Sequence, residues 1–274
     1  MIKTAAQLAV MRESGRLLAQ VFSMLDGFVA AGRSTLELDA AVEAFIRNDL
    51  KARPASLGQY DYPFCINTSI NEVVCHGLPS AKAILKDGDI INIDITLEKG
   101  GFIADSSKMY MIGNVAPKAQ RLVEKTFEAM WAGIRQVRPG ARLGDIGHAI
   151  QSLAQANGYS VVREYCGHGI GREMHEEPQI LHFGRPGTGL ELREGMVFTI
   201  EPMLNQGSAK VRDLKDGWTV VTKDNSLSAQ WEHTVAVTAD GFEVLTLQVP
   251  GRILGVPASC RFTRSVIPAF GQRG

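Results

Sequence analysis

Cysteine is sparse in this sequence: the chain holds four, and no two of them form a C-x-x-C pair. Such a low count argues against a disulfide-stabilised secreted scaffold and predicts free thiols in a reducing compartment. An apolar signal-peptide core is also lacking in residues 1–7, so we expect no secretory leader. We therefore expect a cytoplasmic protein.

A surplus of charge and a long apolar run are both absent. Lys and Arg number 29 and Asp and Glu also number 29, so the formal net charge is zero. Without a basic excess nothing indicates a nucleic-acid partner, and without an apolar run of membrane-spanning length nothing indicates a bilayer. The composition is that of a globular protein, 45% hydrophobic and 21% charged, with a length sufficient for one large or two small domains.

Apolar residues at three- and four-residue steps predict four helices. The first covers residues 5–28. The second follows Ser34, which forms a capping box with Glu37. The third begins at Pro117, a residue that suits the first position of a helix, and the fourth covers residues 143–156.

The two helix pairs also suggest a repeat. The segments VAAG at 29–32 and VRPG at 137–140 lie 108 residues apart, and the same offset aligns Leu38 with Ile146. Any two helix–turn–helix units share such a pattern, so the match is weak by itself. It suggests two similar halves packed about a pseudo-twofold axis.

Residues 90–110 have the alternation and the glycine-containing turn of a β-hairpin. If the turn centres between Lys99 and Gly100, Asp94 and Asp105 face each other, with Cβ atoms roughly 4.5–5.5 Å apart. Two carboxylates so placed repel each other. Either one is protonated, or a cation lies between them, or a bulge sends one of them to solvent.

Two later strands also carry acids. Glu201 ends an apolar strand that starts near residue 196, and Glu232 lies in a strand over residues 229–237. The two numbers sum to 433, which centres on the turn signal Asp216-Gly217, so we expect the strands to be adjacent. Pro202 argues against one continuous hairpin of that length.

Five residues form a candidate metal site. Buried acids are rare unless they are paired or metal-bound, and four acids with one histidine could hold two divalent cations through shared carboxylates. Taken singly, each could instead be a solvated strand-end acid or a hydrogen-bonded core histidine. The candidates are Asp94, Asp105, His168, Glu201 and Glu232.

The other histidines divide into two groups. We interpret His148 and His182 as structural, and His233 as pointing to the strand face opposite Glu232. His76 and His175 lie on turns beside Gly and Pro, where they could polarise a substrate carbonyl or carry protons.

Together these motifs resemble type I methionine aminopeptidase over about residues 2–249. The matching segments are NEVVCHGLP at 71–79, NID at 92–94, DSSKM at 105–109, GHGIG at 167–171, MHEEP at 174–178, TIEP at 199–202 and QWEHT at 230–234. The resemblance implies an α/β (α+β) pita-bread fold, two pseudo-symmetric halves around a mainly antiparallel sheet. It gives one catalytic domain over residues 1–249 and an Arg/Gly/Pro-rich tail over 250–274.

The family activity implied is hydrolysis of the N-terminal methionine from nascent proteins and peptides when the next residue is small. The resemblance implies a monomer that holds two divalent ions (Mn, Fe, Co or Zn), with nascent N-termini as partners and the ribosome as a candidate place of action. Asp94, Asp105, His168, Glu201 and Glu232 become metal ligands, with Asp105 and Glu232 bridging. Glu201 becomes the proton acceptor from the attacking water.

On the substrate side, the resemblance assigns His76 and His175 to substrate contact and Tyr62 and Trp218 to the methionine pocket. The sequence departs from the family pattern in and near that pocket, at Ser56, Gln59, Tyr60, Asn67 and Met174.

Two alternatives stay open. An X-Pro peptidase of the same fold shares the ligands, although such enzymes normally carry an added N-terminal domain for which there is no room. A non-catalytic binding protein of this fold would be marked by lost ligands.

Overall fold

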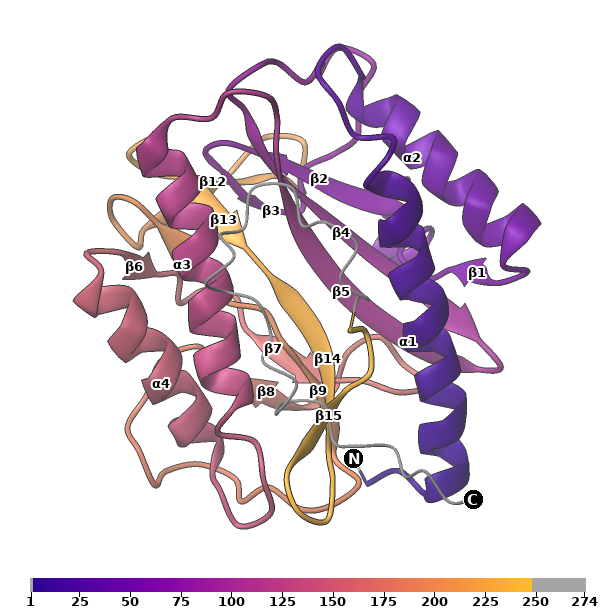
Figure 1. The fold of residues 1–274 in the computed structure, drawn as a ribbon, viewed down its shortest axis with the longest axis vertical. Helices are drawn as coiled ribbons and strands as arrows, with labels where there is room; N and C mark the ends of the chain where they lie inside the picture. Colours follow the sequence, from indigo (N-terminus) through magenta and orange to yellow (C-terminus); the bar gives the residue numbers. More distant parts are fainter. Residues whose placement is uncertain (1, 248–274) are drawn as a thin grey trace, which may run out of the picture.

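The computed structural model describes residues 2–247, in which four helices cover a central sheet (Figure 1). The expected tail over 250–274 lies outside the described residues. The helices are α1 (Ala5–Leu25), α2 (Thr35–Ala44), α3 (Pro117–Ile134) and α4 (Leu143–Ala156). A π-helical turn, Phe45–Asp49, follows α2, and a 3-10 turn, Gln59–Asp61, lies in the loop before β2. No helix in the described part of the chain is long and apolar enough to cross a membrane.

Nine strands form the main sheet, and every strand pair described for residues 2–247 is antiparallel. Its members are β1 (Arg53–Pro54), β2 (Ile66–Ile70), β4 (Ile90–Lys99), β5 (Phe102–Met111), β7 (Gly167–Gly169), β8 (Glu176–Ile180), β9 (Val197–Ile200), β14 (Glu232–Val237) and β15 (Phe242–Val244). The main path runs β1-β4-β5-β14-β9-β7-β8.

Two three-stranded sheets complete the fold. The first joins β6 (Ser160–Val161), β10 (Met203–Asn205) and β13 (Ser228–Gln230). The second joins β3 (Val73–Cys75), β11 (Val211–Asp213) and β12 (Val220–Thr222).

The predicted repeat is present as two structural halves. Helices α2 and α4 begin 108 residues apart, at Thr35 and Leu143. Each start is capped by an acid three residues after the cap, since Glu37 accepts the Ser34 N–H and Asp145 accepts the Arg142 N–H. Figure 1 shows α1 and α2 on one side of the molecule and α3 and α4 on the other, with the strands between them.

Each half has its own apolar core beneath its helices. One core joins Phe22 and Leu38 of the first helix pair to Ile93 of β4. The other joins Ile146 of the second pair to Phe198 of β9, and all five side chains are fully buried. Because both cores lie between helices and sheet, the opposite sheet face is free to carry polar side chains.

The predicted hairpin forms, but its register differs from the expected one. Gly100 and Gly101 are the two turn residues, both with positive φ, so the turn centres one residue later than predicted. Asp94 therefore pairs with Ser107, and Asp105 pairs with Thr96. The expected direct opposition of Asp94 and Asp105 is wrong. A shift of two residues preserves the face, however, so the two acids remain diagonal neighbours on one side of the sheet.

The second acidic strand pair has the register that the sequence predicts. Ile200 pairs with His233, and the same sum of 433 recurs where Met203 pairs with Gln230 and Val211 with Thr222. The same register therefore relates the two chain segments on either side of the turn, although the pairing is divided among three separate pairs of strands. The first break falls at Pro202, which has no N–H to donate.

Candidate metal centre

The five candidate ligands come from different elements and line one cavity of about 330 Å³. Asp94 lies on β4, Asp105 on β5 and Glu232 at the start of β14. His168 lies on β7, and Glu201 directly follows β9. These strands are neighbours in the main sheet, so residues up to 138 positions apart in sequence meet at one place.

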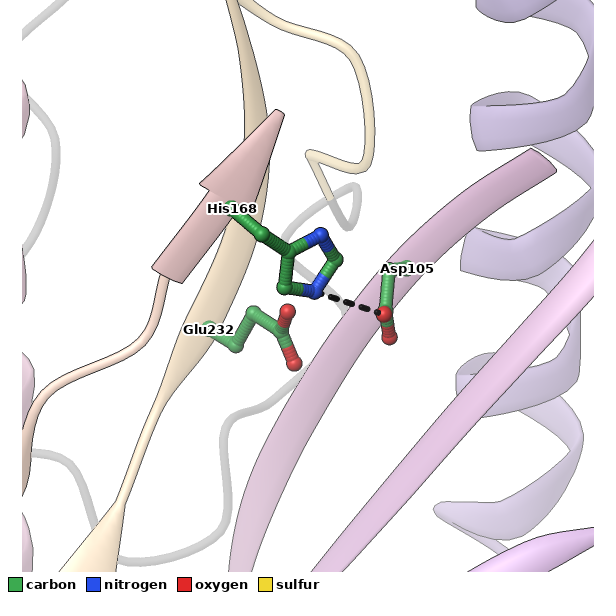
Figure 2. A group of neighbouring side chains, drawn as sticks. All are labelled: Asp105, His168 and Glu232. Atoms are coloured by element: carbon green, nitrogen blue, oxygen red, sulfur yellow. Dashed lines mark ion pairs between the residues drawn. The ribbon is translucent and has the colours of Figure 1, made fainter. Parts of the chain in front are cut away.

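Three of the five lie close enough to share an ion. One ligand atom from each of Asp105, His168 and Glu232 lies within 4.8 Å of the others (Figure 2). His168 Nε2 is 3.7 Å from Asp105 Oδ2 and 3.6 Å from Glu201 Oε1. The structure thus brings Asp105, Glu201 and Glu232 together around His168, and Asp94 lines the same cavity.

The electrostatics of this cluster favour a bound cation. Burial raises the pKa of Asp94 to about 7 and that of Glu201 to about 8. Burial, reinforced by neighbouring carboxylates, also raises the pKa of Asp105 and Glu232 well above the usual range. Burial lowers the pKa of His168 to about 4, with a contribution from nearby His175, so its imidazole is neutral and able to bind a metal.

An unsatisfied atom supports the same conclusion. In the described part of the chain, Asp105 Oδ1 is buried without a hydrogen-bond partner. Such an atom is costly in a protein interior unless it binds something. A set of four carboxylates and one neutral imidazole fits a divalent cation, which would remove that cost.

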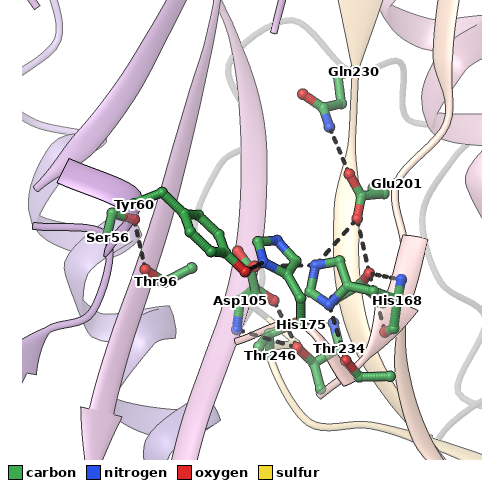
Figure 3. Close-up of polar contacts among 12 residues, drawn as sticks. Ser56, Tyr60, Thr96, Asp105, His168, His175, Glu201, Gln230, Thr234 and Thr246 are labelled. Carbon is green, nitrogen blue, oxygen red and sulfur yellow. Dashed lines mark hydrogen bonds and ion pairs between the residues drawn. The ribbon is translucent and has the colours of Figure 1, made fainter. Parts of the chain in front are cut away.

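Further side chains orient the candidate ligands, and the sequence analysis did not identify them. Thr199 Oγ1 donates to Glu201 Oε1 over 2.8 Å and accepts the His168 N–H over 2.9 Å. Gln230 donates to the other oxygen of Glu201 over 3.3 Å (Figure 3). His182, predicted to be structural, accepts the Glu201 backbone N–H at Nε2. Thr199 lies two residues before Glu201 on the same strand face, so alternation could have indicated it, whereas Gln230 and His182 are revealed only by the fold.

Both predicted active-site histidines line the cavity. The His175 ring meets the His168 ring edge to face, with centroids 4.4 Å apart. His76 is held at a φ of +56° on the turn after β3, with its ring 5.4 Å from that of Tyr165. Burial lowers the pKa of both histidines, so both rings are neutral.

The expected pocket residues line the same cavity. Tyr62 and Trp218 pack edge to face with centroids 4.9 Å apart. Met174 is 7% exposed, and the Ser56 hydroxyl is paired with Thr96 Oγ1 at 2.6 Å. Sequence reasoning missed further lining residues, namely Thr96, Tyr165, Cys166, Gln179 and Met203.

The remaining histidines lie elsewhere, as predicted. His148 is exposed on α4. His233 is buried against Thr246, with Nδ1 3.0 Å from Oγ1, and does not line the cavity.

Sequence comparison relates this arrangement to known proteins. Residues 9–239 match metallopeptidase family M24. The methionine aminopeptidase of Escherichia coli (strain K12) is 51% identical over 247 residues, which cover 90% of this chain and 94% of the relative. Methionine aminopeptidase B of Synechocystis sp. is 53% identical over 249 residues, covering 89% and 90% of the two chains.

Solved structures give the same relationship. The crystal structure of methionine aminopeptidase from Rickettsia prowazekii is similar with a TM-score of 0.88 and 50% identity, covering 90% of this chain and 99% of that one. A prolidase from Pyrococcus horikoshii has a TM-score of 0.71 at 21% identity and is covered over 64% of its length, so that likeness shows the fold alone. The predicted pita-bread fold is confirmed. The chain belongs to metallopeptidase family M24.

Proposed function

We propose that this chain is a metal-dependent methionine aminopeptidase, which removes an N-terminal methionine when the next residue is small. The observation that carries the proposal is the single cavity in which five metal-binding side chains adjoin a wall of Tyr62, Trp218 and Met174. The half-identical methionine aminopeptidases match along nearly all of their length, so the cavity belongs to the shared part of the fold.

Two divalent ions are the proposed cofactor. Asp94, Asp105, His168, Glu201 and Glu232 would hold them. Ions bound there would make water nucleophilic near neutral pH and polarise the scissile carbonyl. Carboxylates with one imidazole suit Mn(II), and they also accept Fe(II), Co(II) or Zn(II).

Glu201 is the proposed proton acceptor. Its carboxylate faces His168 at 3.6 Å and is oriented by hydrogen bonds from Thr199 and Gln230. A carboxylate held in a buried position takes up a proton more readily than one in water. Thr199 at one oxygen and Gln230 at the other fix the carboxylate in the orientation in which it would receive a proton from water.

His76 and His175 are the proposed groups that contact the reacting amide. Both are neutral, so each carries one N–H that can donate to a carbonyl oxygen as negative charge develops on it. Both histidines line the same cavity as the acids, which supports this assignment.

We further propose that the substrates are nascent polypeptides, met in the cytoplasm at or near the ribosome, and that the chain acts as a monomer. The free thiols of Cys65, Cys75 and Cys166 support a reducing compartment. An unbranched methionine side chain would enter the cavity and be held mainly by apolar contact.

The test is a peptide panel with defined metal content. Protein purified without added metal is analysed for bound ions, then assayed on Met-Ala-Ser, Leu-Ala-Ser and Ala-Pro-Ser with added Mn(II) or Co(II). We expect free methionine from the first peptide and loss of activity in Glu232→Gln. Cleavage of Ala-Pro-Ser alone would favour the X-Pro alternative. A folded, metal-loaded protein that cleaves no peptide would favour a binding role.

A further inference from the structure

Tyr60 occupies a backbone conformation that tyrosine rarely adopts. It has a φ of +50° in the turn before β2, and Asp61 follows with a φ of +65°. Left-handed geometry is unfavourable for side chains larger than Asn or Asp, and it persists where the surrounding structure enforces it. Here the turn is closed by hydrogen bonds from the Gly58 N–H to the Tyr62 carbonyl and from the Tyr62 N–H to the Gln59 carbonyl.

This strained turn holds the Tyr60 ring against His175. The two rings are stacked, with centroids 5.8 Å apart and planes 15° from parallel. The phenol Oη lies 3.3 Å from His175 Nδ1 (Figure 3). Tyr60 is nevertheless 66% exposed, so burial of its ring contributes little to its placement. The strained turn therefore has one clear structural effect, which is to hold the Tyr60 ring in contact with His175.

The contact selects a tautomer. A phenol is a good hydrogen-bond donor, and the unprotonated nitrogen of a neutral imidazole is a good acceptor. When the Tyr60 hydroxyl donates to Nδ1, the proton of the neutral ring must be on Nε2. The ring lines the cavity beside His168, so its N–H is then available to a substrate carbonyl.

We propose that Tyr60 is a positioning residue for His175, which fixes the ring as the Nε2–H tautomer and holds its plane toward the substrate. The proposal rests on the proposed role of His175 in peptide hydrolysis. It concerns a position at which this sequence departs from the family pattern.

A kinetic test separates positioning from a structural role. Tyr60→Phe keeps the stacked ring and removes only the hydroxyl. We expect kcat to fall about five- to tenfold with KM within twofold, the effect of one hydrogen bond expressed in the reaction. In a His175→Ala background, Tyr60→Phe should cause no further loss. Tyr159→Phe, which removes a phenol hydroxyl that contacts Arg121 outside the cavity, is the control and should keep wild-type kcat.

Two kinetic outcomes would overturn the proposal: wild-type kcat in Tyr60→Phe, or an equal loss in both backgrounds. If His175→Ala itself turns over normally, the proposed role of His175 fails, and the spectroscopic test then decides about Tyr60 alone.

That test reads the tautomer directly in metal-free protein. Nitrogen-15 NMR of the imidazole distinguishes a protonated Nε2 from a protonated Nδ1. We expect His175 to be the Nε2–H tautomer in the wild type and a mixture of tautomers in Tyr60→Phe. A protonated Nδ1 in the wild type, or an unchanged spectrum in Tyr60→Phe, would refute the assignment.

Discussion

At the scale of single residues, the histidines of the candidate site are distinguished by what they contact and not by exposure alone. His175 and His148 are both solvent-accessible, but His175 contacts His168 and lines the cavity, whereas His148 lies on α4 and does not line it. The sequence predicted this difference from the turn glycines and the helical period. It could not predict Gln230 and His182 as supports of Glu201, because those contacts depend on which segments become neighbours, whereas Thr199 lies only two residues from Glu201.

The separation of ligand and reaction roles can be tested at His175. We expect His175→Ala to keep the metal content of the wild type and to lose a factor of roughly 10²–10⁴ in kcat, the scale for one positioned polarising group. His148→Ala is the matched control and should leave both quantities unchanged. Elemental analysis and peptide kinetics give the answer, and a variant that lost its metals would make His175 a ligand.

A second residue-scale prediction concerns Met174, which is buried and lines the cavity. A flexible thioether forms a more adaptable wall than a ring, and one methylene in an apolar pocket is worth only about 1–3 kcal/mol of discrimination. We expect Met174→Phe to increase the ratio of kcat/KM for Met-Ala-Ser over Leu-Ala-Ser. The assay compares the two peptides at equal metal loading. An unchanged ratio would show that position 174 does not set specificity.

At the scale of elements, the sequence predicts which face of a helix or strand is buried better than it predicts the register in which two strands pair. The predicted helices, the Ser34–Glu37 capping box and the 108-residue offset all appear in the structure. The predicted β4–β5 register was wrong because a shift of two residues leaves every side chain on the same face of the sheet. The alternation of apolar and polar residues therefore cannot detect such a shift. Only the conformations of Gly100 and Gly101 settle the turn, and the left-handed turn at Tyr60 had no residue-type signal.

The N-terminal segment is tied to the loop that carries His175. Lys3 Nζ lies 2.6 Å from Glu176 Oε2, and the Lys3 N–H donates to the Gly195 carbonyl. The Lys3 side chain is 7% exposed, whereas Arg12, in its pair with Glu243, is 46% exposed. Since water screens an exposed pair, the buried one should contribute more to stability.

We expect Lys3→Met to lower the free energy of unfolding by about 1–3 kcal/mol, because it removes a buried ion pair with the carboxylate of Glu176. Amide exchange should accelerate at residues 170–176 and not in α4. Arg12→Met is the matched control, with an expected loss below about 1 kcal/mol. Urea titrations and hydrogen exchange measure both effects, and equal losses in the two variants would refute the argument from burial.

At the scale of the whole molecule, the pseudo-twofold places acids from both halves at one site. Asp94 and Asp105 come from the first half, and Glu201 and Glu232 come from the second. The offset of 107 residues between Asp94 and Glu201 nearly equals the offset that relates α2 to α4. Each half has its own apolar core, so the candidate metal site brings together acids from two separately packed halves.

Metal removal should therefore weaken the whole fold, and more strongly as pH rises. In metal-free protein the folded pKa of Asp94 is about 7 and that of Glu201 about 8, above the ordinary values of 3.8 and 4.5. Between the ordinary and the folded pKa values, the native state binds more protons than the unfolded state. The stability that this proton binding contributes is therefore present at low pH and is lost as pH rises through the folded pKa values. A cation reverses this penalty by binding the ionised carboxylates of the native state alone.

The test measures the melting temperature of chelator-treated and of Mn(II)-loaded protein between about pH 5 and pH 8.5, a range that includes both folded pKa values. We expect the chelated protein to lose stability across the window and Mn(II) to restore most of it at the alkaline end. Glu201→Gln cannot ionise at that position, so the chelated variant should lose less stability with rising pH than the chelated wild type. A melting temperature that is the same with and without metal at every pH would exclude a cation between these carboxylates.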